Sequence, residues 1–296
     1  MRAWQKRNGI SMLGAWRPVG LPARHIWQGR WWWTSLTCLA LLPSCATPPK
    51  AEQAPKEEGP PRAEEIIEKS IKAIGGKAAF ERIHSRLIKA TIEITPGGVK
   101  GTLTSYAAAP NKRYEVVDLE GVGTEESGSD GQVYWSVSAM VGPRILEGEE
   151  KAFSARESVF NSELQWRTLY EKVECVGTDN VDDHLCYTVV RTPKEGAPET
   201  VYYDQKTYLP VKTRFTFKGP MGEVPVELTS TDFKAEDGLL MPHKMIQSVA
   251  GGMQTVTMTM TSIKQNAEIS ADRFALPEPI KELLAKQKAE TKPAPK

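Results

Sequence analysis

Residues 253–263 read MQTVTMTMTSI, and residues 211–218 read VKTRFTFK. In the first stretch Val256, Met258 and Met260 alternate with threonines, and the second stretch alternates in the same way. Successive side chains of a strand point to opposite faces, so each stretch predicts a strand with one apolar and one polar face. Strands of this kind are typical of antiparallel sheets that have one face in water.

The same two-residue period recurs on both sides of these stretches. Residues 86–95 (RLIKATIEIT) and 99–109 (VKGTLTSYAAA) flank the turn signal Pro96-Gly97-Gly98. We count roughly ten or eleven such strands over residues 63–277. Strands do not alternate with helices along the chain, which argues against a parallel α/β sheet.

Two amphipathic helices are predicted beside the strands. Residues 63–74 place isoleucines on one face and end at Gly75-Gly76, and residues 149–164 carry an apolar stripe of Phe153, Phe160 and Leu164. Two short helices cover only part of so wide a sheet, whose apolar face must be covered or must curve upon itself. We therefore expect a mainly β (α+β) fold: an open antiparallel half-barrel with an apolar hollow, whose mouth is covered by these two helices.

The first 44 residues differ in composition from the rest of the chain. They hold six basic groups and no acid, although the whole chain has a net charge of +1. The remainder is therefore mildly acidic and poorly suited to bind nucleic acid. The uncharged run WWWTSLTCLALL at 31–42 is too short for a membrane-spanning helix, which needs about 20 residues. It matches a signal peptide that starts at Met1 or Met12.

The segment after this run, Leu42-Pro43-Ser44-Cys45-Ala46, resembles the lipobox of bacterial lipoproteins, although Pro43 departs from that pattern. In those proteins the Cys becomes the acylated N-terminus. The resemblance implies that residues 1–44 are a lipoprotein signal peptide and that Cys45 carries the lipid anchor. The residue after the Cys is not Asp, which implies an outer-membrane protein that faces the periplasm. An ordinary signal peptide or a buried apolar segment is the alternative.

Two further segments lie outside the predicted half-barrel domain, which covers residues 63–277. Residues 45–62 are rich in Pro, Glu and Lys and are expected to form an extended tether. Residues 278–296 are rich in Lys and Pro, and we expect a disordered tail with at most a short helix over residues 280–286.

Cys175 and Cys186 lie on either side of a hairpin turn predicted at Asp182-Asp183. An exported protein reaches an oxidising compartment, so we expect a disulfide between them. Their spacing about the turn is asymmetric, and pairing would need a bulge. Two buried thiols are the alternative.

Four stretches of the chain resemble bacterial proteins of the outer-membrane lipoprotein-sorting type. They are AEEIIEKSIKAIGG at 63–76, APNKRYEVVDL at 109–119, DGQVYWSVSAMVGPRILEGEE at 130–150 and PETVYYDQKTYLPVK at 198–212. The family's carriers LolA and LolB have an unclosed antiparallel barrel capped by helices, and the resemblance implies this fold for residues 63–277. Its motifs are structural, so no site residue is carried over. A lipid-anchored member is closer in plan to the receptor than to the soluble shuttle.

The sequence lacks the spacings of common catalytic and metal sites. His84, His184 and His243 form neither His-x-His nor His-Glu-x-x-His, so no metal site is expected. Gly128-Ser129-Asp130-Gly131 does not have the spacing of a nucleophile elbow, and Asp182-Asp183-His184 is best explained as a solvated turn. We therefore expect a protein that is not an enzyme and needs no cofactor.

The apolar interior remains as the candidate site. Flexible thioethers suit surfaces that accommodate variable apolar partners, and the body is rich in Met. We expect a hollow that binds an apolar ligand, a lipid or the acyl chains of a lipoprotein, in lipid or lipoprotein trafficking. The candidate lining residues are Trp135, Met140, Phe153, Phe160, Trp166, Met258 and Met260. The alternative is an envelope adaptor whose filled core leaves only its surface to dock a partner protein.

Overall fold

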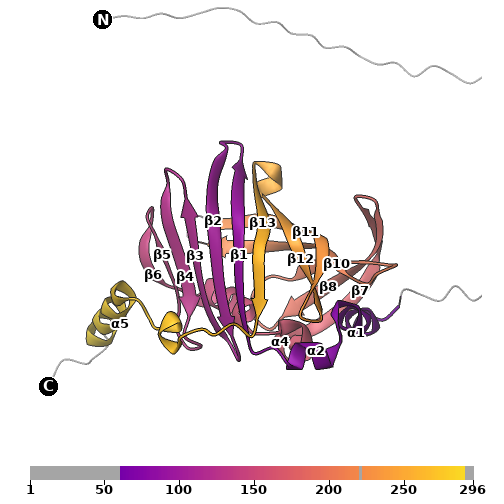
Figure 1. The fold of residues 1–296 in the computed structure, drawn as a ribbon, viewed down its shortest axis with the longest axis horizontal. Coiled ribbons are helices and arrows are strands. Elements are labelled where there is room, and N and C mark those ends of the chain that lie inside the picture. Colours follow the sequence, from indigo (N-terminus) through magenta and orange to yellow (C-terminus); the bar gives the residue numbers. More distant parts are fainter. Residues whose placement is uncertain (1–60, 220–221, 291–296) are drawn as a thin grey trace, which may run out of the picture. The chain divides into compact units, whose positions relative to one another are not determined.

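Thirteen antiparallel strands form one continuous sheet in the order β6-β5-β4-β3-β2-β1-β13-β12-β11-β10-β9-β8-β7 (Figure 1). The structure is a computed structural model that describes residues 61–219 and 222–290. The predicted signal peptide, Cys45 and most of the predicted tether lie outside the described residues. Along residues 61–219 and 222–290, no pairing joins the two edge strands β6 and β7. The sheet is therefore open, and the predicted antiparallel half-barrel is confirmed.

The strands on one side of the sheet centre are β1 (Ser85–Thr95), β2 (Val99–Ala108), β3 (Lys112–Leu119), β4 (Gly123–Ser129), β5 (Tyr134–Ser138) and β6 (Gly142–Ile145). Those on the other side are β7 (Tyr170–Val181), β8 (His184–Pro193), β9 (Glu199–Asp204), β10 (Pro210–Gly219), β11 (Gly222–Glu236), β12 (Leu239–Val249) and β13 (Gln254–Gln265). β1 and β13 pair at the centre, so the two ends of the domain sequence meet there.

The helices are α1 (Ala63–Ile74), α2 (Lys77–Glu81), α3 (Gly148–Ser158), α4 (Trp166–Leu169) and α5 (Glu278–Glu290). The α1 helix ends as predicted, because the backbone N–H of Gly76 donates to the Ile71 carbonyl over 2.8 Å. Gly75 is required here for space as well, since a Cβ on it would lie 2.3 Å from the Gly238 carbonyl oxygen.

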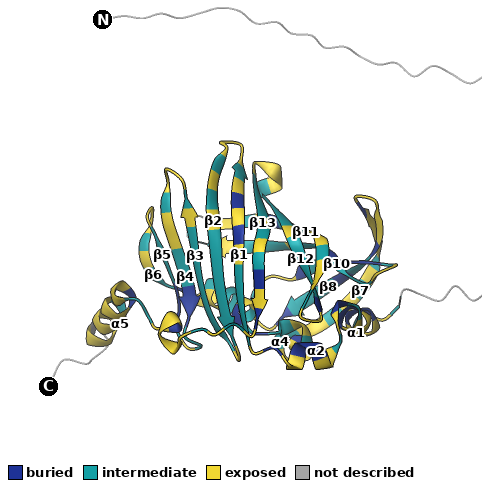
Figure 2. Ribbon diagram, in the orientation of Figure 1, coloured by how far each residue is buried: buried dark blue, intermediate teal, exposed yellow. Residues whose placement is uncertain are grey.

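The two boundaries of the sheet at which the strands begin and end differ in what covers them. The hairpin turns β1–β2, β3–β4, β5–β6 and β12–β13 gather at one edge, which we call the rim, at the top of Figure 1. Helices α1, α2 and α4 lie at the opposite edge, at the bottom of Figure 1. Buried apolar side chains of α1 and α2 pack there with Val189, Val201 and Leu239 of the sheet. Figure 2 shows that most rim residues are half-buried or exposed.

Two strands were not predicted from the sequence, and the inserted helix is shorter than predicted. β4 (GTEESGS) and β6 (GPRI) carry no alternation of apolar and polar residues, so their pattern gave no strand signal. The helix predicted over 149–164 ends at Ser158, because Val159 is extended and Asn161 has a left-handed φ of 52°. A 3-10 turn (Ser162–Gln165) and α4 follow, and Phe160 is therefore not on a helix.

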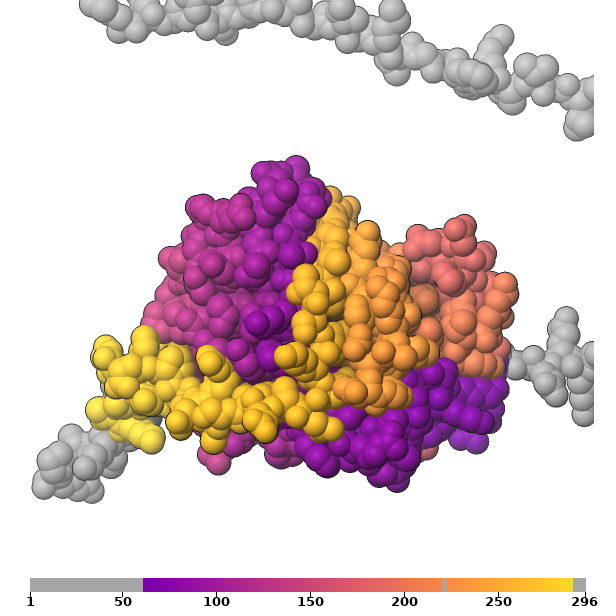
Figure 3. Space-filling model, viewed as in Figure 1, coloured from indigo at the N-terminus to yellow at the C-terminus, as the bar shows by residue number. Residues whose placement is uncertain are grey.

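The C-terminal segment is ordered further than predicted. After β13 the chain crosses the lower part of β1 to β3 on the convex side, visible in yellow in Figure 3. The Arg273 guanidinium lies 4.8 Å from the ring centroid of Tyr106. Helix α5 continues to Glu290, and Ile280 in its first turn is fully buried. α5 includes the short helix expected over residues 280–286 and is longer at both ends, so the disorder predicted for the rest of 278–290 is wrong.

The predicted disulfide between Cys175 and Cys186 is also wrong, since both thiols are free. Cys175 lies opposite Val189 on β8, so these two side chains share a face of the sheet. Cys186 comes three residues before Val189 on the same strand, and an odd separation places it on the other face. The two sulfurs therefore lie on opposite sides of the sheet and cannot bond.

Candidate functional site

The concave face of the sheet lines a hollow of about 790 Å³ that reaches the rim at Ile94, Leu119 and Val249. Its lining comes mainly from β1, β3 and β10 to β13, together with one face of α3. Pockets of about 300 to 1,000 Å³ are typical of small-molecule sites. The hollow is therefore large enough to hold a ligand.

Alternation along neighbouring strands makes the wall of the hollow apolar. Ile94 on β1 lies beside Val256 on β13, and Ile92 lies beside Met258, which in turn lies beside Met245 on β12. All five line the hollow. Because antiparallel neighbours on directly opposite positions share a face, these side chains form continuous apolar rows across the strands.

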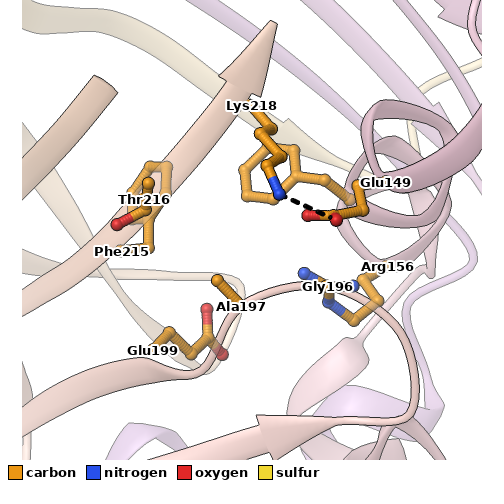
Figure 4. A pocket seen from close by; sticks show the side chains of 9 residues that line it. Glu149, Arg156, Gly196, Ala197, Glu199, Phe215, Thr216 and Lys218 are labelled. Atoms are coloured by element: carbon orange, nitrogen blue, oxygen red, sulfur yellow. Dashed lines mark hydrogen bonds and ion pairs between the residues drawn. The ribbon is translucent and has the colours of Figure 1, made fainter. Parts of the chain in front are cut away.

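Helix α3 spans the hollow and is held on both sides. On one side Phe153 packs against Phe215 and Phe217 of β10, with ring centroids 5.3 and 5.6 Å apart. The Lys218 ammonium also pairs with Glu149 over 2.9 Å, as Figure 4 shows. α3 is otherwise polar and buries only Ser158 in full.

On the other side, Arg144 of β6 donates two hydrogen bonds to Glu150 of α3, over 2.5 and 3.2 Å. Three residues after Phe153, Arg156 donates to the Glu195 carbonyl over 2.8 Å and lies beside Gly196 in Figure 4. α3 is therefore attached to both wings of the half-barrel by a few discrete contacts and leaves the hollow beneath it unfilled.

The end of the hollow away from the rim is charged. We call this region the floor and define it by Arg113 and Glu115 of β3, Glu157 of α3, Arg191 of β8 and Glu199 of β9, which all line the hollow. Arg113 pairs with Glu115 over 2.6 Å, and Arg191 pairs with Glu199 over 2.7 Å. Each arginine thus has a carboxylate of its own.

The floor pairs perturb one another through close contact in a region with little solvent. Burial favours the neutral form of Glu115, but the adjacent Arg113 outweighs burial and lowers the pKa of that carboxyl. Tyr170 donates a hydrogen bond to Glu199, and burial next to this carboxylate raises the pKa of the tyrosine well above its ordinary value. The Arg113–Glu115 pair therefore stays charged at neutral pH.

Glu157 differs from the other floor residues. Among the described residues it makes no hydrogen bond and no ion pair, and its side chain is accessible from the hollow. The residue is exposed, and partial desolvation by the neighbouring protein, opposed by the charge of Arg113, raises the pKa of its carboxyl. Glu157 is thus the one floor carboxylate whose oxygens remain open to a ligand.

A second cavity of about 190 Å³ lies beyond the floor, beneath α1. Ile67 and Ile71 of α1 and Trp166 of α4 line it. Glu157 and Arg191 line both cavities, so the floor separates them.

The structure disperses the residues predicted to line the hollow. Phe153, Met258 and Met260 do line it, and Trp166 lines the second cavity. Three others lie elsewhere. Trp135 is buried beside Tyr114, Phe160 belongs to the core under α1, and Met140 is exposed on the β5–β6 turn of the rim.

Sequence reasoning missed the charged floor altogether. Arg113, Glu115, Arg191 and Glu199 come from strands whose alternation was recognised or suspected, but a polar residue on an expected inner face carried no signal of its own. Their meeting with Glu157 depends on the curvature of the sheet, which a linear pattern does not specify.

Two features are absent from residues 61–219 and 222–290. No group of three or more His, Cys, Asp or Glu side chains in this part of the chain could hold a metal ion. None of the helices described there has the length and apolarity to cross a membrane. His184 pairs with buried Asp204 over 2.8 Å, and this places it in a turn network with Thr207.

Comparison with known proteins identifies the fold. No protein-family model matches the chain, and no curated protein sequence matches it. Among solved structures, a LolA superfamily protein from Nitrosomonas europaea is similar with a TM-score of 0.51 and 13% identity, over 73% of this chain and 99% of that one.

Two further structures have the same fold. An outer membrane lipoprotein-sorting protein domain from Vibrio parahaemolyticus is similar with a TM-score of 0.50 and 14% identity, over 75% of this chain and 99% of that one. A DUF1329 family protein from Desulfovibrio piger has a TM-score of 0.50 and 15% identity, over 72% and 97% of the two chains. The predicted LolA-like fold is confirmed, and identities this low show the fold alone.

Proposed function

We propose that this chain is a lipid-anchored, periplasm-facing envelope protein that binds an apolar ligand in the hollow of its half-barrel. The ligand is a lipid or the acyl chains of a lipoprotein, and the protein acts in lipid or lipoprotein trafficking. Binding is non-covalent and needs no cofactor.

The observation that carries this proposal is the apolar wall, which the described side chains leave unfilled. Side chains such as Val256, Met258 and Leu228 face a volume of about 790 Å³ and are only half-buried. Protein interiors are normally packed as tightly as organic crystals, so an apolar hollow of this size is not an ordinary core. Each methylene that a ligand buried against the wall would contribute about 0.8 kcal/mol.

The envelope location rests on the sequence and on the fold. The lipobox-like segment ends at Cys45, and the fold is shared with a domain described as an outer membrane lipoprotein-sorting protein. Stable anchoring takes more than one acyl chain, which lipoprotein maturation at a Cys supplies. We expect radiolabelled palmitate to be incorporated into the protein and to be lost in Cys45→Ala. Unchanged labelling of that variant would end the anchor proposal.

Ligand binding is tested by placing a charge on either face of one strand. Met258→Glu puts a carboxylate on the wall of the hollow, whereas Thr259→Glu puts the same group on the exposed convex face of β13. We expect the full-length protein to bind a fluorescent fatty acid. Met258→Glu should weaken that binding about tenfold or more, because the charge must lose its hydration when an acyl chain covers it.

The same experiment separates the proposal from the adaptor alternative. Thr259→Glu should bind like the wild type, and melting curves of both variants should show that they fold. If the wild-type protein binds no fatty acid and lipid extraction of the purified protein yields no lipid, the hollow is not a ligand site. The adaptor function would then be preferred.

A further inference from the structure

We propose that the floor of the hollow is a head-group site for an amphiphile with a primary ammonium head, whose acyl chain lies along the apolar wall toward the rim. This inference rests on the proposed function and adds to it the class of ligand and the direction in which it binds.

The lining becomes more polar along β3 and β10, while Glu125 of β4 is the charged lining residue nearer the rim. On β3 the inward residues run from Leu119 and Val117 near the rim to Glu115 and Arg113 at the floor. On β10 they run from Phe217 near the rim to Thr213. Two strands from opposite wings thus have the same polarity gradient, which matches a ligand with one apolar and one polar end.

The hydrogen-bonding groups of the floor decide which polar end fits. The guanidinium groups of Arg113 and Arg191 already donate to Glu115 and Glu199. Glu157 has both carboxylate oxygens free of partners among the described residues. An ammonium group only donates hydrogen bonds, so it complements Glu157, whereas a carboxylate head only accepts them.

The charges around Glu157 come from three other elements and from its own helix. Arg113 of β3, Arg191 of β8 and Glu199 of β9 face it, together with Arg156 one residue before it on α3. The arginines hold the carboxylate in place electrostatically, but two of them are bonded to other acids and Arg156 donates to the Glu195 carbonyl. A ligand cation would therefore meet an acceptor that no group of the floor already occupies.

A purely structural ion cluster would have a different arrangement. Such clusters are stable when each charge has a partner, because an unpartnered buried charge is costly. The two arginine–carboxylate pairs are complete without Glu157. Glu157 is exposed to the hollow and adds a carboxylate that neither pair uses.

The test uses three probes that share a dodecyl chain and differ only at the head: dodecylamine, dodecanol and dodecanoate. Their affinities for the full-length protein are measured by displacement of a fluorescent fatty acid at neutral pH. We expect affinity to fall in the order amine, alcohol, carboxylate. The amine should bind at least about tenfold more tightly than the carboxylate, because a hydrogen bond to a charged group contributes that much to affinity.

Substitution of the acceptor then assigns the site. Glu157→Gln should weaken dodecylamine about tenfold and leave dodecanol nearly unchanged. The matched control is Glu93→Gln, which removes a carboxylate from the exposed convex face of β1 and should leave all three affinities unchanged. The melting temperature of each variant shows that it folds.

Any other result contradicts either the head-group site alone or the proposed function as well. If the three probes bind equally, if dodecanoate binds tightest, or if Glu157→Gln leaves the affinity for the amine unchanged, the head-group site is wrong while the proposed function stands. If no probe binds, both the head-group site and the proposed function fail.

Discussion

Removing the Phe153 ring should loosen α3 without loosening the sheet. Phe153 is the only large apolar side chain of α3, and its contacts are Phe215 and Phe217 of β10. An aromatic pair contributes about 0.5–1.5 kcal/mol beyond the area that it buries, so two pairs contribute about 1–3 kcal/mol. Phe153→Ala should lower the free energy of local opening of α3 by that amount, which increases the open population about 5- to 150-fold.

Native-state hydrogen exchange measures this opening directly, because protected amides of a helix exchange at a rate set by its local opening equilibrium. We expect the amides of α3 to exchange faster by the same factor in Phe153→Ala. Amides of β1 and β13 at the centre of the sheet should keep their wild-type protection, since α3 contributes nothing to their pairing.

The control removes a ring from a stacked pair on the other face of the sheet. Tyr106 lies 6.1 Å from Tyr114, and its neighbour Ser105 lines the hollow, so Tyr106 points to the convex side. Tyr106→Ala should leave exchange in α3 unchanged. Unchanged α3 exchange in Phe153→Ala, or equal acceleration in α3 and β1, would refute the view that this ring is a local clamp.

Three further predictions concern other parts of the molecule. Ile280→Ala should release α5, at a cost of about 2–5 kcal/mol to its docking because the side chain is fully buried, and limited proteolysis should then cleave near residue 280. Cys175 and Cys186 should both be alkylated when the protein is unfolded without reductant, because both thiols are free. In the native protein Cys186 should react slowly, since burial raises the pKa of its thiol to about 11. Peptide mapping that shows alkylation only after reduction would contradict the free thiols. The raised pKa of Glu157 means that the folded protein holds this proton more tightly than the unfolded chain does, so the wild type should lose stability as the pH rises from the unfolded value through the folded one. Glu157→Gln should abolish that loss, and a urea-unfolding series across this pH range that shows parallel curves would count against it.

Alternation and turn signals were sufficient to predict most of the sheet. The apolar rows of β1 and β13 follow a strict two-residue period, and the isoleucines of α1 end at a Gly-Gly pair, so each local pattern agrees with the final fold. β4 and β6 have no such period: β6 is an edge strand, and in β4 the buried Gly128 is required because a Cβ there would collide with the Trp135 ring. Their strand pairing is imposed by neighbours and not by their own sequence.

The candidate site was less predictable than the fold for two physical reasons. An aromatic residue has the same sequence pattern in a filled core as in a cavity wall. Phe153 lines the hollow and Phe160 lies in the core because α3 ends between them, and the sequence pattern did not predict that helix end. The floor joins β3, α3, β8 and β9, which come from opposite wings of the sheet and meet only because the sheet curves. The disulfide prediction was wrong for a related reason, since the separation of two Cys along the sequence does not specify which face of the sheet each of them occupies.

The two ends of the concave face differ in how far they are filled, and this difference argues for an occupant. Near α1 the sheet residues Val189, Val201 and Leu239 are fully or almost fully buried under helical side chains. Toward the rim α3 supplies one ring, and apolar residues of the wall such as Met258 remain half-buried. Contiguous apolar surface that stays accessible is costly in water and is typical of binding sites. A larger apolar side chain on α3 would cover that surface, yet the helix face beside Phe153 carries serine, alanine and charged residues. The hollow therefore follows from the composition of α3, and a ligand that fills it would supply the burial that the helix does not.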